Sequence, residues 1–276
     1  MIKILLFFSP VFICSGLCAQ SDTSYLKVYK TNPKLEIPGP IIFFCGSYFG
    51  FKALDNIASL TEAEVKNLNP ETINSFDRPV AFYNPAEFLS AQQTSDLFMN
   101  IFVASPALLL INKRIRHDWK DFASMFLMTH ATGNVIYFAS AFSVRRARPL
   151  TFNPAVPLAD KIGDNKTNSF FSGHTAWTAM STFFITKVYT DYHQIKGIKR
   201  ILIYTGAAIP PGLVGYYRME AGKHFKSDVI TGLLIGAACG IGVPELHRIK
   251  EKNRNFSMRP FFMQGANGIS LSYNIK

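Results

Sequence analysis

Five apolar runs follow one another after residue 96 and limit what this chain can fold into. They cover residues 97–112, 122–144, 175–188, 201–217 and 229–246. A helix that crosses a bilayer needs about 20 residues, so several runs span a membrane only if the polar ends of their helices are included. The pattern predicts an all-α, membrane-embedded bundle of five to six helices. Pro210-Pro211-Gly212 predicts a kink within the fourth run.

The composition agrees with a membrane-associated protein of one domain. The 276 residues are 48% hydrophobic and only 17% charged, with a formal net charge of +11. A basic balance fits anionic substrates or anionic lipid, although basic residues flanking membrane spans account for much of it. The sequence lacks a nucleic-acid motif and a compact Lys/Arg run interleaved with aromatics. We therefore expect no nucleic-acid partner.

The chain divides into four parts on sequence grounds. Residues 1–19 carry one lysine, an apolar core and small residues near Ala19, which predicts a secretory signal peptide; an uncleaved signal anchor is the alternative. Residues 20–96 form an extracytoplasmic lead-in, with a candidate first membrane helix over residues 37–54. The bundle is expected over residues 97–254.

Two smaller features lie outside that bundle. Thr61 begins a Thr-Glu-Ala-Glu sequence that resembles a capping box and predicts a helix start. The tail over residues 255–276 alternates apolar and polar side chains in the manner of a short hairpin, to which we assign no role.

Basic residues mark alternate connections between the runs. They are Lys113, Arg114, Arg116, Lys120, Lys196, Lys199, Arg200, Arg248, Lys250, Lys252 and Arg254. Lys and Arg concentrate in cytoplasmic connections, which places these residues inside. The other connections, which carry Arg148, His174 and residues 218–228, then share the outer side. The expected location is the bacterial inner membrane, multi-pass, with this side facing the periplasm.

The candidate chemistry lies in those outer connections. If the chain is helical from Phe225, His224 and Asp228 are one turn apart, so the carboxylate can fix the imidazole tautomer and raise its basicity. A histidine held in this way is a nucleophile. His174 follows Ser172-Gly173, and Arg148 closes an earlier apolar run. Two histidines, two arginines and a flexible Ser-Gly pair predict a phosphate site.

These motifs resemble a known signature. Arg148-Pro149, Ser172-Gly173-His174 and the segment from Arg218 through His224 to Asp228 match, in order and spacing, the three-part signature of the type 2 phosphatidic acid phosphatase (PAP2) superfamily. That superfamily includes membrane lipid phosphatases, soluble bacterial acid phosphatases and vanadium haloperoxidases. The resemblance covers roughly residues 95–246. Three residues depart from the usual pattern: Ala141 replaces a lysine, Phe171 a proline and Tyr217 a serine.

The resemblance implies a role for each motif residue. His224 would attack phosphorus to give a phosphohistidine, with Asp228 orienting it, and His174 would protonate the leaving oxygen and then activate water. Arg148 and Arg218 would clamp the phosphoryl oxygens. The backbone of Ser172-Gly173, at a helix N-terminus, would donate to the same oxygens. No cofactor is implied, and no metal is expected, because the two arginines would repel a divalent ion.

A third phosphate-binding cation has to be found elsewhere because Ala141 replaces the lysine. If the preceding helix continues, Ala141, Arg145 and Arg148 share a face, so Arg145 is our prediction for this role. If the chain is already extended from Arg146, that side chain points the same way as Arg148. Arg146 is then the alternative.

The expected activity is metal-independent removal of phosphate from a lipid phosphate or diphosphate, with a membrane lipid as the only implied partner. A secreted soluble acid phosphatase of the same fold is an alternative. A non-enzymatic transporter, with the same histidines and arginines lining an anion path, is another. A vanadium-dependent peroxidase is a third.

Overall fold

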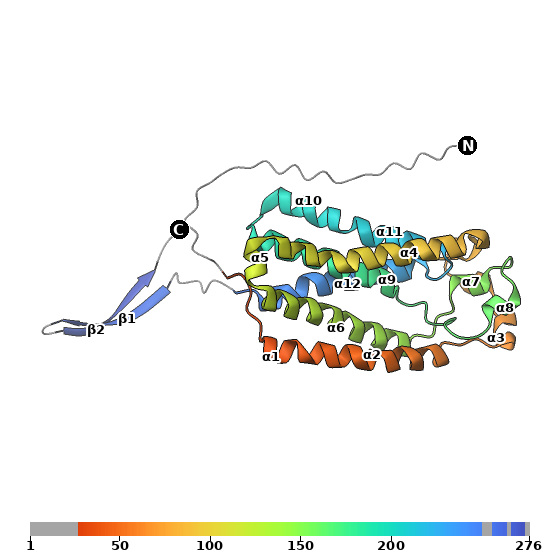
Figure 1. The fold of residues 1–276 in the computed structure, drawn as a ribbon, viewed down its shortest axis with the longest axis horizontal. Helices are drawn as coiled ribbons and strands as arrows, with labels where there is room; N and C mark the ends of the chain where they lie inside the picture. Colours follow the sequence, from red (N-terminus) through yellow and green to blue (C-terminus); the bar gives the residue numbers. More distant parts are fainter. Residues whose placement is uncertain (1–26, 250–255, 264–265, 274–276) are drawn as a thin grey trace.

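Long helices run side by side along the long axis of the molecule (Figure 1). The computed structural model describes residues 27–249, 256–263 and 266–273. The long helices are α2 (Pro38–Ile57), α4 (Phe88–Ala104), α6 (Trp119–Ser143), α9 (Gly173–Tyr192), α10 (Gly197–Ala207), α11 (Ile209–Glu220) and α12 (Lys226–His247). The expected all-α bundle is confirmed. If α10 and α11 are taken as two halves of one broken helix, the described chain has six such rods.

Short helices join and cap the rods. They are α1 (Pro33–Glu36), α3 (Glu62–Lys66), η1 (Pro70–Thr72), η2 (Arg78–Phe82), η3 (Pro85–Glu87), η4 (Ser105–Ile111), α5 (Lys113–His117), α7 (Pro149–Phe152) and α8 (Leu158–Lys161). Of these, α3, α7 and α8 lie at one end of the bundle and α5 at the other (Figure 1). The predicted capping box is confirmed at α3, where Thr61 and Glu64 exchange hydrogen bonds between side chain and backbone.

The break in the fourth apolar run falls where the prolines predicted it. Helix α10 ends at Ala207, and α11 begins at Ile209 with Pro210 and Pro211 in its first turn. Proline has no N–H to donate, which is tolerated at a helix start but not in a helix interior. The predicted kink is therefore a boundary between two helices.

The C-terminal tail forms the predicted hairpin. Strand β1 (Phe256–Met263) pairs antiparallel with β2 (Ala266–Tyr273), and Phe256 lies opposite Tyr273. The expected signal peptide over residues 1–19 lies outside the described residues.

Helices α9 and α12 pack closely along a seam of glycines. A Cβ on Gly232, Gly236 or Gly240 would lie 2.3–2.6 Å from a backbone oxygen of residues 172, 176 or 180 in the opposite helix or its cap. Small residues at every fourth position let two helix backbones approach each other. The seam fixes the position of His174, at the start of α9, relative to the loop that precedes α12.

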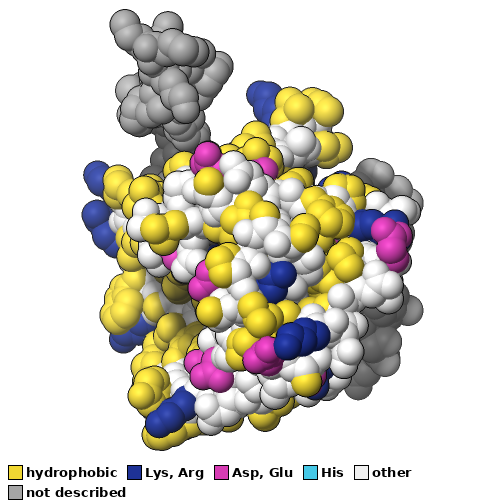
Figure 2. All heavy atoms as spheres, turned by 90° about the vertical axis from the view of Figure 1, so that its right-hand side faces the viewer, with side chains coloured by type: hydrophobic (Ala, Val, Ile, Leu, Met, Phe, Trp, Pro, Cys, Tyr) yellow, Lys and Arg dark blue, Asp and Glu magenta, His cyan; other side chains and the backbone are white. Residues whose placement is uncertain are grey.

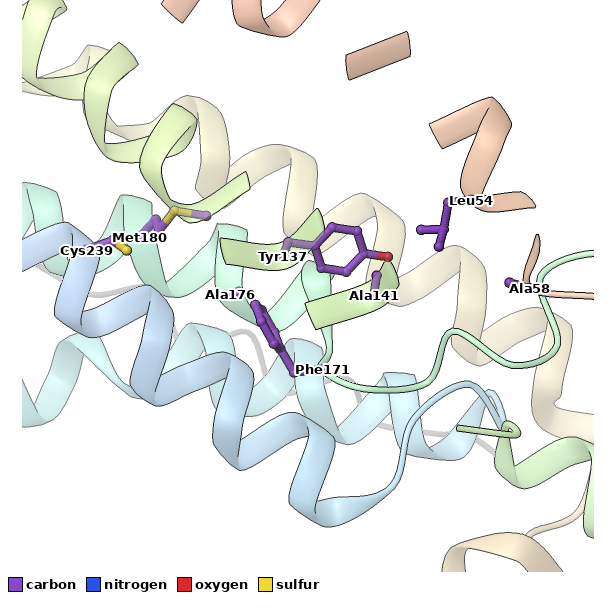
Figure 3. Close-up of a cluster of buried hydrophobic side chains, with 8 residues drawn as sticks. All are labelled: Leu54, Ala58, Tyr137, Ala141, Phe171, Ala176, Met180 and Cys239. Atoms are coloured by element: carbon purple, nitrogen blue, oxygen red, sulfur yellow. The ribbon is translucent and has the colours of Figure 1, made fainter. Parts of the chain in front are cut away.

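An apolar cluster joins α2, α6, α9 and α12 beside this seam. Figure 3 shows its members: Leu54, Ala58, Tyr137, Ala141, Phe171, Ala176, Met180 and Cys239. Ala141, at the position of the missing lysine, points into this cluster and is 7% exposed. An alanine is therefore what the local packing requires here.

Three helical segments are long and apolar enough to cross a membrane. They are Pro33–Ile57, Pro85–Ile111 and Lys226–His247. The first includes residues 37–54, the candidate first membrane helix. Large apolar side chains such as Ile42, Phe49 and Leu89 are about 70% exposed on the bundle. An apolar exterior of this kind belongs to a protein embedded in a membrane.

Candidate active site

The predicted motifs meet at one end of the bundle. Arg148 caps the start of α7, His174 lies in the first turn of α9, and Arg218 lies in the last turn of α11. His224 lies in the turn between α11 and α12, and Asp228 in the first turn of α12. Figure 2 looks onto this end, which carries charged side chains of both signs between hydrophobic ones.

His224 is held by a backbone carbonyl. The residue is 3% exposed, and Nδ1 lies 2.7 Å from the carbonyl oxygen of Ser169. A carbonyl can only accept a hydrogen bond, so Nδ1 must donate, which leaves a lone pair on Nε2. Burial and the charges of Arg218 and Arg148 also hold the pKa of His224 well below its ordinary value. The imidazole is therefore neutral near pH 7, with one nitrogen ready to attack an electrophile.

Asp228 occupies a different place from the one expected. Helix α12 begins at Lys226, so His224 lies outside the helix and does not share a helical face with Asp228. The carboxylate accepts from the Ser169 hydroxyl at 2.6 Å and from the backbone N–H of Phe225 at 2.8 Å. Asp228 thus fixes the two residues that position His224: Ser169, whose carbonyl binds the ring, and Phe225, its neighbour.

The two arginines present unused donors to the site. Arg148 is 9% and Arg218 5% exposed. Arg148 Nε donates to Asn168 at 3.0 Å, while Arg218 Nη1 lies 3.5 Å from both Ser95 Oγ and Asp96 Oδ1. Arg218 Nε is buried with no acceptor among the described residues. Leaving a buried charged donor unpaired is costly, so an anion bound here would be stabilised.

His174 is paired with an aspartate that sequence reasoning missed. Its Nε2 lies 2.9 Å from Asp96 Oδ1, on α4, and its ring stacks on Trp177 with centroids 6.0 Å apart. Burial and the charge of Arg218 lower the pKa of His174 to about 4, and the Asp96 carboxylate opposes this shift. The imidazole is therefore neutral near pH 7 in the empty site, and an anion bound between Arg218 and His174 would favour the protonated form that acts as a general acid. One signal was available in the sequence: Asp96 is the only charged residue between Phe88 and Ile111.

Ser172 is the N-cap of α9 and Gly173 is its first residue, where a phosphate-binding backbone was expected. The backbone N–H groups of the two residues differ in whether they are already hydrogen-bonded. The N–H of Ser172 already donates to the carbonyl of Asp228 at 3.0 Å, and its hydroxyl lies 2.9 Å from that of Thr175. The first-turn amides of Gly173 and His174 have no such partner among the described residues. A phosphoryl oxygen would therefore meet these two amides at the positive end of a 20-residue helix.

Arg145 lies away from the site, contrary to our prediction. Helix α6 ends at Ser143 and Val144 is extended, so the helical face shared with Ala141 does not continue. The Arg145 guanidinium instead donates to the Ser59 carbonyl at 2.9 Å and to Glu64 at 2.8 Å, and its side chain is 55% exposed.

Arg146, the alternative candidate for the third phosphate-binding cation, is already hydrogen-bonded to other side chains. One guanidinium nitrogen donates to Asp228 and to Ser227, and the other donates to Asp77 at 2.8 Å. The guanidinium also lies over the Phe225 ring, 4.4 Å from its centroid. Arg146 therefore braces the loop that carries His224 and forms ion pairs with two buried carboxylates. Asp77, which nothing in the sequence pattern singled out, also accepts from the Ser227 backbone at 2.9 Å.

One family model matches part of the chain. The model of the PAP2 superfamily matches residues 121–252, so this segment is similar to that superfamily. The matched PAP2 segment contains Arg148, His174, Arg218, His224 and Asp228, whereas Asp77 and Asp96 precede it. The acid partner of His174 thus comes from outside the matched segment.

Two solved structures are similar to the chain. One is LpxE of Aquifex aeolicus, with 24% identity over 59% of this chain and 87% of the other, at a TM-score of 0.40. The second is a transmembrane PAP2 type phosphatidylglycerolphosphate phosphatase from Bacillus subtilis, with 18% identity over 78% of this chain and 94% of the other, at a TM-score of 0.42. No curated protein sequence matches the chain.

Proposed function

We propose that this protein is a metal-independent phosphatase that removes phosphate from a lipid phosphate or diphosphate at the periplasmic face of the inner membrane. The observation that carries the proposal is the pairing of a buried, neutral His224, whose Nδ1 is bound to the Ser169 carbonyl, with the buried Arg148 and Arg218, of which Arg218 has an Nε without an acceptor among the described residues. A nucleophile facing an anion-binding clamp is the arrangement that phosphoryl transfer needs.

The mechanism follows from these positions. The phosphoryl oxygens bind to Arg148, to Arg218 and to the amides at the start of α9, which stabilises the charge that spreads over them in the transition state. Nε2 of His224 attacks phosphorus as the bond to the leaving oxygen breaks. His174, oriented by Asp96 and protonated once the phosphoryl anion offsets the charge of Arg218, gives that oxygen its proton and then accepts one from the water that hydrolyses the phosphohistidine. Inorganic phosphate leaves last.

The decisive test is a phosphate-release screen over lipid phosphates and diphosphates, with purified protein and chelator present. We expect turnover by the wild type, trapping of an acid-labile phosphoenzyme by rapid quench, and no turnover by His224→Ala in protein that still elutes as folded material. Full activity of His224→Ala would contradict the assignment of the nucleophile. An absence of phosphate release from every substrate would favour the transporter alternative.

A membrane-extraction experiment separates the proposal from a soluble acid phosphatase of the same fold. Three apolar helices and the exposed apolar side chains on α2 and α4 support the membrane form. We expect the protein to remain in the membrane pellet after carbonate extraction at high pH, and its recovery in the supernatant would contradict that location.

A further inference from the structure

A cavity of about 330 Å³ lies at the end of the bundle opposite the candidate active site, where α9 and α12 end and α10 begins (Figure 1). We call it the basic cavity. Its charged lining residues are Lys27, Asp191, Lys196, Arg200, Glu245 and Arg248. The mechanism above uses none of them.

The two carboxylates of the basic cavity are already paired with a buried cation that does not line it. The side chain of Lys187 is 2% exposed, and its Nζ donates to Asp191 and to Glu245, at 2.5 Å in each case. Among the lining cations, Lys27 pairs with Asp121 at 2.7 Å. The other three lining cations are less completely bonded.

Lys196, Arg200 and Arg248 keep unused hydrogen-bond donors. The Arg248 guanidinium lies 3.7 Å from Asp191 and 3.6 Å from Glu245, which is beyond hydrogen-bond distance. Arg200 approaches Asp191 with one nitrogen, Nη2, at 3.0 Å. The exposed Lys196 ammonium has no hydrogen bond or ion pair to any residue in the described part of the chain. An anion in the cavity would supply the acceptors that these donors lack.

Arg200 also lines a second depression, a groove of about 460 Å³ on the surface of α10. We call it the α10 groove; Ile201, Tyr204 and Thr205 form the rest of its lining. Ile201 is 61% exposed, and the Thr205 hydroxyl donates to the Ile201 carbonyl at 3.0 Å, so this donor is not free. The Tyr204 hydroxyl lies 3.3 Å from Arg200 Nη2. Arg200 thus lies where a charged cavity meets an apolar groove.

The position of this junction in the bundle favours a phospholipid over a soluble anion. The basic cavity lies where the apolar helix over Lys226–His247 ends, which is the level of the lipid headgroups for a helix that crosses the membrane. Basic pockets at the cytoplasmic ends of membrane helices attract anionic headgroups. A soluble phosphate ester would fill the basic cavity alone, whereas a phospholipid has both a charged and an apolar part.

We propose that the basic cavity and the α10 groove together bind one anionic phospholipid of the cytoplasmic leaflet. Its phosphodiester accepts from Lys196, Arg200 and Arg248, and one acyl chain lies along the α10 groove. The inference uses the membrane location of the protein but not the reaction at the other end, so its failure would leave the proposed phosphatase activity untouched.

The test is native mass spectrometry of the full-length protein, delipidated in detergent and titrated with single lipids. Phosphatidylglycerol should bind about tenfold more tightly than phosphatidylethanolamine with the same acyl chains, because the amine of the second lipid would face the unpaired cations. Glycerophosphoglycerol, the headgroup of the first lipid without its chains, should bind at least about tenfold more weakly, since it leaves the α10 groove empty.

Lys196→Gln tests the headgroup contact. Because its side chain has no partner among the described residues, the substitution should not disturb folding, and we expect about fivefold weaker binding of phosphatidylglycerol. Lys199→Gln is the matched control, because it removes the same charge from the exposed first turn of α10, outside the cavity lining. Its effect should stay below about twofold.

Ile201→Ser tests the acyl-chain contact. It should weaken binding of phosphatidylglycerol about threefold or more and leave binding of glycerophosphoglycerol unchanged. Leu202→Ser is the control, because Leu202 is 63% exposed, against 61% for Ile201, but does not line the α10 groove.

Three results would overturn the inference. They are equal affinities for phosphatidylglycerol and phosphatidylethanolamine, equal affinities for phosphatidylglycerol and its free headgroup, and equal losses in Lys196→Gln and Lys199→Gln. The first would show that the protein binds lipid without regard to charge. The second would show a site for a soluble anion, and the third would show attraction by the basic surface as a whole.

Discussion

At the scale of single residues, the environment of His224 determines the pH range in which it can act. The Ser169 carbonyl fixes the tautomer, and burial with Arg218 and Arg148 lowers the pKa. A lowered pKa means that the neutral, nucleophilic form survives as the pH falls and is lost only when the pH drops through the lowered value. A solvated histidine would begin to lose it at about pH 6.5.

We therefore expect the acid limb of kcat/KM that belongs to His224 to lie well below about pH 6.5, the ordinary pKa of a histidine. The measurement is a rate profile from pH 4 to pH 8, with two substrates whose phosphate groups have different pKa values. A limb due to substrate ionisation moves between the two substrates, whereas the limb of the enzyme stays fixed. A fixed limb at pH 6.5 or above would show that the imidazole is not perturbed.

Asp96 should matter most when the leaving oxygen needs a proton. Asp96→Asn removes the carboxylate that favours protonated His174, so we expect kcat to fall about tenfold or more for an alkyl phosphate. With p-nitrophenyl phosphate, whose leaving group departs without a proton, the loss should stay below about threefold. Equal losses for both substrates would indicate that Asp96 has a purely structural role.

Arg146→Ala and Arg145→Ala should differ in their effect on the free energy of unfolding, because only Arg146 pairs with buried carboxylates. Arg146→Ala leaves Asp77 and Asp228, both with 0% exposed side chains, without their cation, which should lower the free energy of unfolding by about 3–5 kcal/mol. Arg145→Ala breaks a half-exposed pair with Glu64, a loss of about 1 kcal/mol or less, and should leave kcat/KM unchanged. Thermal unfolding in detergent measures both. A stable Arg146→Ala variant would contradict its bracing role.

Ala141→Lys should not restore a phosphate-binding cation. The side chain at this position points into the cluster around Leu54, Tyr137 and Phe171, where an ammonium would lose its hydration without gaining a partner.

At the scale of helices, the α9–α12 seam holds both halves of the site together. Gly236→Ala would place a Cβ 2.3 Å from the Ala176 carbonyl oxygen, so the two helices must separate. Separation moves His174 away from the loop that carries His224. We expect a lower unfolding temperature and loss of most activity.

Gly242→Ala in the same helix is the control, because nothing lies within 4 Å of its added Cβ. It should keep full activity and should gain slightly in stability, since alanine is about 1 kcal/mol more favourable than glycine in a helix. Equal behaviour of the two variants would show that the seam does not position the site.

At the scale of the whole molecule, the two ends of the bundle carry different polar groups. The site lies at the end with α3, α7 and α8, whereas the other end holds a buried ion network around Asp191. Asp191 accepts from Tyr29 at 2.8 Å and pairs with Lys187 and with Arg200. Further basic residues surround this second end, as expected for a cytoplasmic face.

A labelling experiment tests this orientation. In a Cys45→Ser parent, which removes an exposed thiol, Asp164→Cys near the site should react with an impermeant thiol reagent on intact spheroplasts. Lys199→Cys, exposed at the other end, should react only after lysis. The parent provides the background from the remaining cysteines. Labelling of Lys199→Cys in intact spheroplasts would reverse the orientation.

The sequence by itself determined the helical runs, the break at Pro210, the cap at Thr61, the tail hairpin and the motif residues. These depend on local hydropathy, backbone propensity and short spacings, which the chain carries in adjacent residues. Only the tertiary structure decided that His224 is held by Ser169, that His174 is paired with Asp96 and that Arg146 is used as a brace. The partners in these contacts lie 55, 78 and 82 residues apart. Packing brings these partners together. Because α6 ends at Ser143, Arg145 and Arg146 follow an extended residue and no longer take the directions that a continued helix would give them.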